Sequence, residues 1–343
     1  MSKTLHLDAA TSADIARAAQ ILRENRLVAF PTETVYGLGA NALSAEAVAG
    51  IFVAKKRPSW DPLIVHLSSA EQLPRITEIP DNLRSRIASL TKHFWPGPLT
   101  LLLPRNAMIP DSVTAGRPLV GVRVPAHPVA RALLAAADLP IAAPSANLFG
   151  HTSPTTAAHV LDDLSGRIDA VLDGGPSNIG VESTVLDPTT TPMVIYRPGA
   201  ITAGQLTLAT GIEVERFREN PDLPHLPESL PSPGVGIRHY APRARLILVS
   251  GDADALGGAI TRLQQEHPEP IGVMLPDGWP LPADVMIEPW ASWSDSGALA
   301  ARLFAVLRAL DDRGATMIVC PLPEPGGIND ATLDRLHKAA KTQ

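Results

Sequence analysis

Residues 27–56, LVAFPTETVYGLGANALSAEAVAGIFVAKK, have the pattern of a strand, a loop and a helix in that order. The apolar run at residues 27–30 is typical of a short β-strand, and a proline ends it. Gly37 and Gly39 permit a tight loop, after which Ser44 caps a helix that runs to the end of the stretch. Because strand, polar loop and helix form the repeating unit of α/β proteins, we expect that class here.

The same alternation continues on both sides of this stretch. Residues 11–25 carry apolar side chains at helical spacing behind a Thr11 or Ser12 cap, and this pattern predicts an amphipathic helix. Further helices are expected at residues 82–94 and 128–137, and strands at 63–67, 99–103, 119–124, 140–143, 170–173, 184–187 and 193–196. The pattern favours a mixed sheet, and polar segments that follow its strands are where such sheets bind ligands.

A change of composition divides the chain. Residues 209–242 mix charges with prolines and show no clear period, so we expect a linker there. Residues 243–343 alternate again, with strands expected at 245–249, 270–275, 283–287 and 316–319 and helices at 253–266, 298–310 and 330–341. We therefore expect an N-terminal domain at 1–208 and a smaller Rossmann-like α/β domain at 243–343. The latter has no GxGxxG after its first strand, which argues against NAD binding.

Composition and charge narrow the function classes. The 343 residues are 45% hydrophobic and 19% charged, which suits two domains with sizeable cores. The net charge of -6 is uneven, because residues 1–208 hold 17 basic and 17 acidic side chains whereas 209–343 hold 12 and 18. An anionic ligand should therefore bind the N-terminal part. The chain has no basic tail of the kind that would indicate tight, nonspecific nucleic-acid binding.

Apolar runs and cysteine content predict the cellular location of the chain. The apolar runs fall well short of the roughly 20 residues that span a bilayer, so we expect a cytoplasmic protein with no membrane partner. A single cysteine, Cys320, excludes an internal disulfide and a thiolate metal cluster. Its setting in TMIVCPLP favours a structural thiol in a buried strand.

The first polar segment after a strand brings several hydroxyl groups together. Thr32, Glu33, Thr34 and Tyr36 lie between the strand at 27–30 and two glycines. Their side chains and exposed N–H groups can face one small ligand. A capped glycine turn explains the same residues equally simply, because hydroxyls often bond the local backbone.

A basic cluster ends the helix that follows. Lys55, Lys56 and Arg57 offset the helix dipole, which is one sufficient explanation for them. Asp61 and His66 follow within ten residues, and a polyphosphate needs cationic donors such as a guanidinium fork. His66, within the strand LIVHL, is by itself more typical of a hydrogen-bonded core residue than of a catalyst.

A second group of polar residues follows the strand at 140–143. Ser145 and Asn147 lie just past this run, and Ser153 with Pro154 is expected to start a helix whose N–H groups suit phosphate. An ordinary N-cap is the simpler explanation of Ser153 alone. The GxxxxGKS pattern does not occur, so any ATP site is not a Walker-type P-loop.

Three polar residues interrupt or end other apolar strands. Arg123 in VGVRVP must find an anionic partner or reach a cleft, and a substrate carboxylate would satisfy it. Ser183 and Arg197 each lie at a strand end. No cluster of His, Asp and Glu has the spacing of a tight zinc site, so we expect no resident metal. A magnesium ion held on nucleotide phosphates would leave no such trace.

Eight ordered segments carry a resemblance to a known family. PTETVYGLGANA, KKRPSWDPLIVH, FWPGPLTLLL, VGVRVP, APSAN, SPTT, GVESTV and YRPG resemble, in that order, the threonylcarbamoyl-AMP synthase family of YrdC-like proteins. The segment SPGVGIRHYAP at residues 232–242 and the C-terminal α/β domain are similar to the long, two-domain form of that family. The resemblance implies a catalytic N-terminal domain with a twisted mixed sheet and a concave ligand face, crossed by the linker.

The resemblance also implies a reaction and its partners. L-threonine, bicarbonate and ATP, with Mg²⁺, would give threonylcarbamoyl-AMP and pyrophosphate. The product would supply the threonylcarbamoyl group for the adenosine beside the anticodon of tRNAs that read codons beginning with A. tRNA and the downstream transferase complex are therefore the implied macromolecular partners.

Site residues follow by position from the same resemblance. Lys55 and Arg57 form the KxR pair, to which the resemblance assigns catalysis, and Ser145 with Asn147 forms the SxN pair. The residues implied to surround L-threonine are Thr34, His66, Arg123, Ala143 and Ser183. Those implied to surround ATP are Arg57, Asp61, Ser145, Asn147, Ser153, Arg197, His239 and Tyr240.

Two other functions compete with this interpretation. Carbamoyl-adenylate formation in hydrogenase maturation uses a related domain, but that system resembles a larger protein with cysteine zinc motifs, and this chain has one cysteine. A non-enzymatic RNA-binding module is the other, since the family's concave face is often basic. The balanced charge of residues 1–208 favours catalysis over RNA binding alone.

Overall fold

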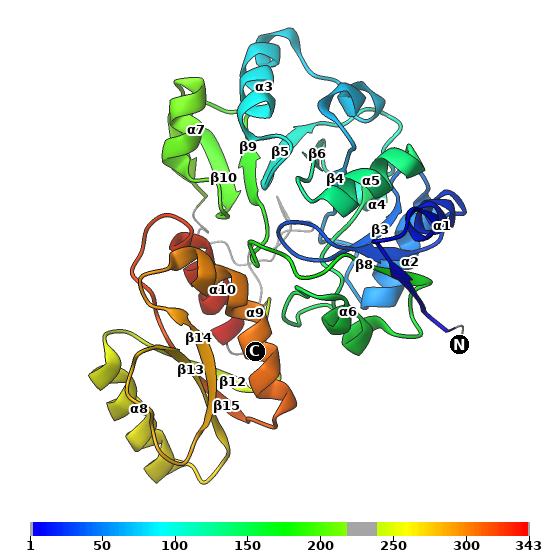
Figure 1. Cartoon of the computed structure of the whole chain (residues 1–343). Helices are drawn as coiled ribbons and strands as arrows, with labels where there is room; N and C mark the ends of the chain where they lie inside the picture. Colours follow the sequence, from blue (N-terminus) through cyan, green and yellow to red (C-terminus); the bar gives the residue numbers. More distant parts are fainter. Residues whose placement is uncertain (1–2, 218–238, 342–343) are drawn as a thin grey trace. The chain divides into compact units, whose positions relative to one another are not determined.

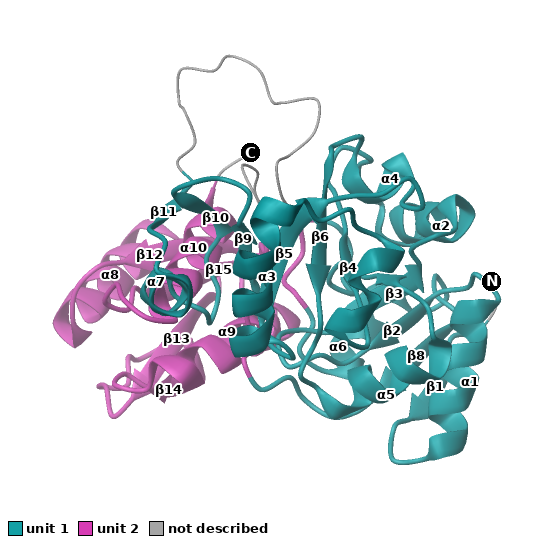
Figure 2. Cartoon of the chain, turned by 90° about the horizontal axis from the view of Figure 1, so that it is seen from above, with its two compact units in different colours: residues 1–149, 154–178, 182–236 teal, residues 150–153, 179–181, 237–343 magenta. Residues whose placement is uncertain are grey.

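The computed structural model describes residues 3–217 and 239–341, which belong to two units (Figure 2). The first unit comprises residues 1–149, 154–178 and 182–236, and the second comprises 150–153, 179–181 and 237–343. Two short pieces of the N-terminal half thus belong to the second unit. Residues 218–238, most of the expected linker at 209–242, lie outside the described residues, so the expected domain boundaries at 208 and 243 stay predictions.

A mixed sheet runs through the first unit (Figure 1). Within residues 3–217 it has 11 strands in the order β1-β8-β2-β3-β7-β4-β6-β5-β9-β10-β11. Their bounds are β1 Leu5–Asp8, β2 Val28–Phe30, β3 Gly37–Asn41, β4 Ile64–His66, β5 Leu99–Pro104, β6 Leu119–Arg123, β7 Ile141–Ala142, β8 Ala170–Asp173, β9 Thr184–Asp187, β10 Met193–Arg197 and β11 Val214–Arg216. Parallel pairs such as β4 with β6 alternate with antiparallel pairs such as β5 with β6, so the expected mixed α/β class is confirmed.

Helices cover this sheet and bury alternate side chains of its strands. They are α1 Ser12–Arg23, α2 Ala45–Lys55, α3 Asp81–Phe94, α4 Asp111–Thr114, α5 Pro128–Ala137, α6 Ala157–Leu164, α7 Ala203–Thr210 and the 3₁₀ helix η1 Ala70–Arg75. In β2, Val28 and Phe30 join a core cluster with α1 and α5, whereas Ala29 joins the larger cluster with α2, α3 and α6. This alternation is the period of two that puts successive strand residues on opposite faces.

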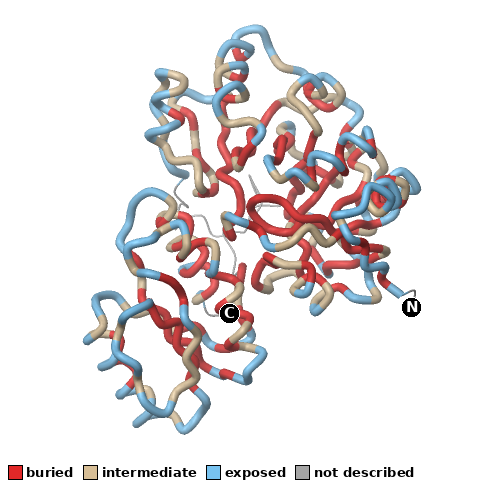
Figure 3. The backbone as a smooth tube through the Cα atoms, viewed as in Figure 1, coloured by how far each residue is buried: buried red, intermediate tan, exposed pale blue. Residues whose placement is uncertain are grey.

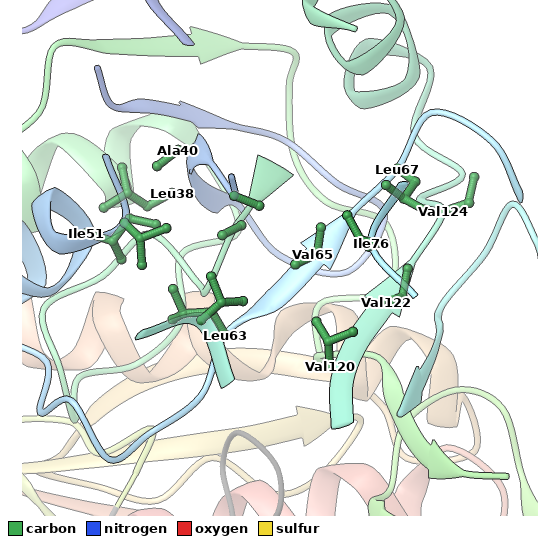
Figure 4. Close-up of a cluster of buried hydrophobic side chains, with 14 of the residues drawn as sticks. Leu38, Ala40, Ile51, Leu63, Val65, Leu67, Ile76, Val120, Val122 and Val124 are labelled. Carbon is green, nitrogen blue, oxygen red and sulfur yellow. The ribbon is translucent and has the colours of Figure 1, made fainter. Parts of the chain in front are cut away.

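The larger core fixes the strands from which the candidate site residues emerge. Figure 4 shows Leu38 of β3 beside Ile51 of α2, and both belong to the same core cluster as Val65 of β4 and Val122 of β6. Buried backbone follows the strands, and exposed positions gather on the outer helices (Figure 3). At the start of α2, Ser44 accepts a hydrogen bond from the N–H of Ala47 at 3.2 Å, which is the cap that the sequence predicts.

The second unit has a parallel four-stranded sheet in the order β12-β15-β13-β14. Its elements are β12 Arg245–Val249, α8 Ala253–Glu266, β13 Ile271–Asp277, β14 Met286–Ser292, α9 Ser296–Asp312, β15 Met317–Pro321 and α10 Asn329–Ala340. The expected alternation is present in order, and β14 extends five residues beyond its expected end. Cys320 is fully buried in β15, where burial raises the pKa of its thiol, as suits a structural residue.

Several elements differ from the sequence expectations. The glycine-rich residues 37–41, expected as a loop, form β3 between β2 and β7. Residues 214–216, expected as linker, pair with β10 as strand β11. Ser153 does not start a helix: α6 begins at Ala157, and its N-cap is Thr156, which accepts from the N–H of His159.

Membrane insertion of a helix finds no support in the described part of the chain. None of the helices within residues 3–217 and 239–341 combines the length and apolar character needed to cross a bilayer.

Candidate active site

Two loops that carry candidate residues are joined to each other by backbone hydrogen bonds. The N–H of Leu38 donates to the carbonyl of Pro144 at 2.8 Å, and the N–H of Ala146 donates to the carbonyl of Tyr36 at 2.8 Å. A β-bridge between Gly37 and Ser145 lies between these bonds. The hydroxyl-rich loop after β2 and the segment after β7 therefore form one backbone platform.

Arg123 is the centre of a buried polar cluster at the end of β6. Its Nη1 donates to Thr34 Oγ1 at 2.9 Å, and its Nη2 lies 2.6 Å from Glu33 Oε1. Its Nε donates to the carbonyl of Gly97 at 3.2 Å. Burial opposes ionisation of Glu33, but the charge and hydrogen bond of Arg123, together with two backbone hydrogen bonds, outweigh it, so the pKa of Glu33 is lowered. These three contacts, one from each nitrogen, fix the direction of the guanidinium.

His66 lies beside Arg123 on the neighbouring strand. The parallel register of β4 and β6 pairs His66 with Arg123, and Phe30 contacts the imidazole edge-on at a ring distance of 6.1 Å. Burial, aided by the nearby Arg123 charge, lowers the pKa of His66 to about 3. At neutral pH the ring is uncharged, so it can bind a ligand by hydrogen bonding but cannot contribute positive charge. Ala143 follows β7, and its N–H donates to the carbonyl of Ile64 at 2.8 Å.

Lys55 holds the loop that contains the SxN pair. Its Nζ donates to the carbonyl of Ser145 at 2.6 Å and also to that of Asn147. Ser145 Oγ in turn donates to Asn147 Oδ1 at 2.5 Å. Full burial lowers the pKa of Lys55 well below its ordinary value, and the charge of Arg57 adds to this. These bonds make Lys55 a brace for the loop, while its predicted catalytic role remains a prediction.

Arg57 and Asp61 form a buried ion pair just after α2. Arg57 Nη2 lies 2.9 Å from Asp61 Oδ2, and both side chains are at most 3% exposed. Arg57 also donates to the carbonyls of Asp61 at 3.2 Å and Pro62 at 2.8 Å. Burial raises the pKa of Asp61 despite the opposing charges of Arg57, Lys55 and Arg197.

Arg197 ties the end of β10 to the residue that precedes β9. Its Nε donates to the carbonyl of Ser183 at 3.0 Å, and its Nη2 donates to Ser183 Oγ at 3.1 Å. The hydroxyls of Ser183 and Thr100 share a hydrogen bond of 2.8 Å. Strand pairing along β4, β6, β5, β9 and β10 places His66, Arg123, Ser183 and Arg197 at one edge of the sheet.

The remaining predicted residues belong to the second unit. Ser153 is fully buried, and His239 and Tyr240 are at most 8% exposed. The rings of His239 and Tyr240 lie 4.4 Å apart. The predicted residues of the first unit thus lie around the strand ends and the joined loops. Ser153, His239 and Tyr240 belong to the second unit, which is described by itself.

Sequence reasoning missed three groups that contact the predicted residues. Glu33 is a polar loop residue that lies outside the expected site set, although its carboxylate pairs with Arg123. Thr100 contacts Ser183, and the carbonyl of Gly97 accepts from Arg123. Thr100 could have been found in the sequence, because it is the one hydroxyl residue in the apolar strand at 99–103. The carbonyl of Gly97 could not, because a backbone group leaves no trace in the sequence.

A resident metal centre does not form among the described residues. Within residues 3–217 and 239–341 there is no group of three or more His, Cys, Asp or Glu side chains placed to hold an ion. The buried carboxylates Glu33 and Asp61 are both paired with arginines.

Comparisons with known proteins agree with this architecture. A family model of the Sua5, YciO and YrdC proteins, described as "Telomere recombination", matches residues 20–199, and one described as "Threonylcarbamoyl-AMP synthase, C-terminal domain" matches residues 201–341. The crystal structure of Pyrococcus abyssi Sua5 complexed with L-threonine superposes with a TM-score of 0.87 at 38% identity, covering 99% of this chain and 98% of that one. The fold and the site thus define a two-unit α/β enzyme of the Sua5 type.

Sequence relatives give the family more narrowly. Threonylcarbamoyl-AMP synthase of Pyrococcus abyssi is 42% identical, covering 94% of this chain and 93% of the relative. That of Bacillus subtilis is 43% identical, covering 95% and 92%. The chain belongs to the threonylcarbamoyl-AMP synthase family.

Proposed function

We propose that this chain is a nucleotidyltransferase that converts L-threonine, bicarbonate and ATP into threonylcarbamoyl-AMP and pyrophosphate. Family membership supports this, and so do the buried guanidinium groups of Arg57, Arg123 and Arg197. Two substrates that carry a carboxylate and a triphosphate need such groups, because guanidinium forks match both anions. The product would serve tRNA modification beside the anticodon, which places the enzyme in the cytoplasm with tRNA and the downstream transferase complex as partners.

At the threonine end, Arg123 would bind the substrate carboxylate. The L-threonine complex of the Pyrococcus abyssi relative supports an amino-acid site in this fold. Thr34 already contacts Arg123, and Ser183 adds a hydroxyl at the same sheet edge as His66. Since burial keeps His66 uncharged, the imidazole would bind the threonine by hydrogen bonding and leave the carboxylate to Arg123.

At the nucleotide end, Arg57 and Arg197 would bind the phosphates. Asp61 fixes the guanidinium of Arg57, and Ser183 fixes that of Arg197. The loop of Ser145 and Asn147, braced by Lys55, supplies further polar groups, and Ser153, His239 and Tyr240 are the proposed ATP contacts from the second unit. Mg²⁺ would arrive as part of the substrate Mg·ATP, because an ion on phosphates needs few protein ligands.

The chemistry we propose needs no covalent bond to the protein. Bicarbonate loses hydroxide to give carbon dioxide, to which the threonine amine adds. The amine releases a proton that combines with the hydroxide to form water, and the product is a carbamate. A carbamate oxygen then attacks the α-phosphorus of ATP, and the bond to the β-phosphate breaks as pyrophosphate leaves. Catalysis would come from holding the two reactants in line and from cations that neutralise the phosphate charge.

The observation that carries this proposal is the placement of His66, Arg123, Ser183 and Arg197 at one sheet edge. The test is pyrophosphate release by the full chain, measured with each substrate omitted in turn. We expect release only when threonine, bicarbonate and ATP are all present. Release that is independent of threonine would contradict the proposal.

A further inference from the structure

Helix α9 presents one stripe of side chains to three short segments of the second unit. Ala301, Phe304 and Arg308 are spaced by three and four residues, so they lie on one face of the helix. A helix rises about 1.5 Å per residue, so the stripe is about 10 Å long. Each of its three positions contacts a different segment.

The first contact is with Gly180, where the backbone of residues 179–181 lies directly against the helix. A Cβ added to Gly180 would lie 2.4 Å from Ala301 Cα and 2.5 Å from the Ala301 carbonyl oxygen. Gly180 also has φ of +77°, a left-handed conformation that favours glycine. Both features require glycine here, three residues before Ser183.

The second contact is with Tyr240. Phe304 packs against the Tyr240 ring at a centroid distance of 5.8 Å, and the guanidinium of Arg335 on α10 lies 5.2 Å from the ring centroid. Tyr240 has φ of +64°, which is strained for a residue with a side chain. The buried ring contacts stabilise this strained backbone and thereby fix the neighbouring His239.

The third contact is with residues 150–153. Arg308 Nη2 donates to the carbonyl of Thr152 at 2.5 Å. The N–H of Ala241 donates to the carbonyl of Gly150 at 2.8 Å, and Ala241 forms a β-bridge with His151. The segment before Ser153 is therefore bound both to α9 and to the residue that follows Tyr240.

We propose that the stripe of Ala301, Phe304 and Arg308 positions three segments that carry or lead to substrate contacts. This inference rests on the proposed function, in which Ser153, His239 and Tyr240 contact ATP and Ser183 contacts threonine. It gives the C-terminal α/β domain a direct role in substrate affinity. Arg308 and Phe304 act through other residues, so they are positioning residues.

The test measures KM for ATP and for threonine in the pyrophosphate-release assay with the full chain. Arg308→Ala should raise KM for ATP by about tenfold and leave KM for threonine within about twofold, because the held segment leads to an ATP contact. Gly180→Ala should raise KM for threonine by about tenfold, because its segment leads to Ser183. Arg308→Lys should restore part of the ATP affinity, since an ammonium can donate one of the lost bonds.

Arg302→Ala is the matched control on the same helix. Arg302 is half exposed and donates to the carbonyl of Pro289 at 2.7 Å, outside the stripe. Both of its KM values should equal those of the wild type. If circular dichroism shows that Arg308→Ala is unfolded at the assay temperature, the KM for ATP of Arg308→Lys is compared with that of Arg302→Ala instead.

The inference is overturned if folded Arg308 variants keep the wild-type KM for ATP, or if only kcat falls while both KM values are unchanged. A wild-type chain without threonine-dependent pyrophosphate release would refute the proposed function itself. The two failures are therefore distinguishable.

Discussion

At the scale of single residues, the site depends on guanidinium groups whose directions are fixed before any substrate binds. Arg123 contacts a carboxylate, a hydroxyl and a backbone carbonyl, and each contact uses a different nitrogen. Glu33 supplies the carboxylate, so a substrate carboxylate would meet a guanidinium that is already paired. Preorganisation of this kind lowers the ordering cost of binding.

Replacing Arg123 tests the threonine end of the site. Arg123→Lys should raise KM for threonine by at least about tenfold, because an ammonium cannot reproduce the planar fork. KM for ATP should change by less than about twofold. Arg105→Lys is the control, since Arg105 pairs with the exposed Asp111. Equal threonine KM values for Arg123→Lys and wild type would contradict the role of Arg123.

Arg57 tests the nucleotide end, and its ion pair requires a paired design. Arg57→Ala should slow adenylate formation by at least about tenfold, because one phosphate-binding guanidinium is lost. It also leaves the buried Asp61 without that partner, which destabilises the fold. Arg57→Ala/Asp61→Ala removes both charges and should regain stability in thermal unfolding but not activity. Recovery of the rate in the double variant would show that Arg57 matters only for folding.

The buried His66 predicts a specific pH dependence of stability. Its pKa of about 3 in the folded state lies below the ordinary value of 6.5, so the unfolded chain binds more protons between these values. Stability is therefore fully present above pH 6.5 and is lost as the pH falls toward 3. Between about pH 6 and 4, wild type should lose up to about 1.4 kcal/mol per pH unit more than His66→Gln. The prediction is refuted if urea unfolding gives wild type and His66→Gln the same dependence of unfolding free energy on pH.

At the scale of elements, β3 shows why a glycine-rich stretch can be a strand. A Cβ on Gly39 would lie 2.9 Å from Phe30 Cε1 and 3.0 Å from Ile141 Cγ2. Only glycine lets β2, β3 and β7 pack this closely, so tertiary packing outweighs the low strand propensity of the sequence.

This close packing predicts opposite effects at two glycines. Gly39→Ala should lower the unfolding free energy by about 1–3 kcal/mol through overpacking. Gly50→Ala, in α2, should raise it by about 0.5–1 kcal/mol, because a Cβ there meets Leu27 at an ordinary 3.5 Å and alanine favours helix. Denaturant unfolding of both variants measures the difference. A destabilised Gly50→Ala beside an unaffected Gly39→Ala would contradict the packing argument.

Sequence periodicity predicts the elements with strong patterns and fails where packing decides. Strands such as β5 and β6 and helices such as α5 were expected at nearly their observed bounds, because apolar runs and caps mark them. β1, with one buried residue, and the three-residue β11 were missed, since short edge strands bury too little to leave a pattern. Ser153 resembles an N-cap in the sequence, but Thr156 is the cap that the helix uses.

The candidate site was foreseeable by residue type but not by contact. A buried arginine must have a partner, and the structure gives Arg123 one. The partner of Arg123 is Glu33, which lies in the loop after β2. No local sequence pattern predicts that this loop contacts the end of β6. The brace from Lys55 to the carbonyls of residues 145 and 147 is hidden for the same reason.

At the scale of the whole molecule, charge is distributed in keeping with an enzyme that binds small anions. Residues 1–208 are balanced in charge and the acidic excess lies in residues 209–343. A module that binds RNA alone would need a basic face, whereas Arg57, Arg123 and Arg197 are buried. Buried guanidinium groups recognise a substrate better than they attract a polymer.

The proposed reaction joins carbon from bicarbonate to threonine and then to AMP. Mass spectrometry of the product formed from ¹³C-bicarbonate, threonine and ATP tests it most directly. We expect a threonylcarbamoyl-AMP ion that carries the labelled carbon and disappears when threonine is omitted. An adenylate that forms without the label, or AMP attached directly to threonine, would contradict it.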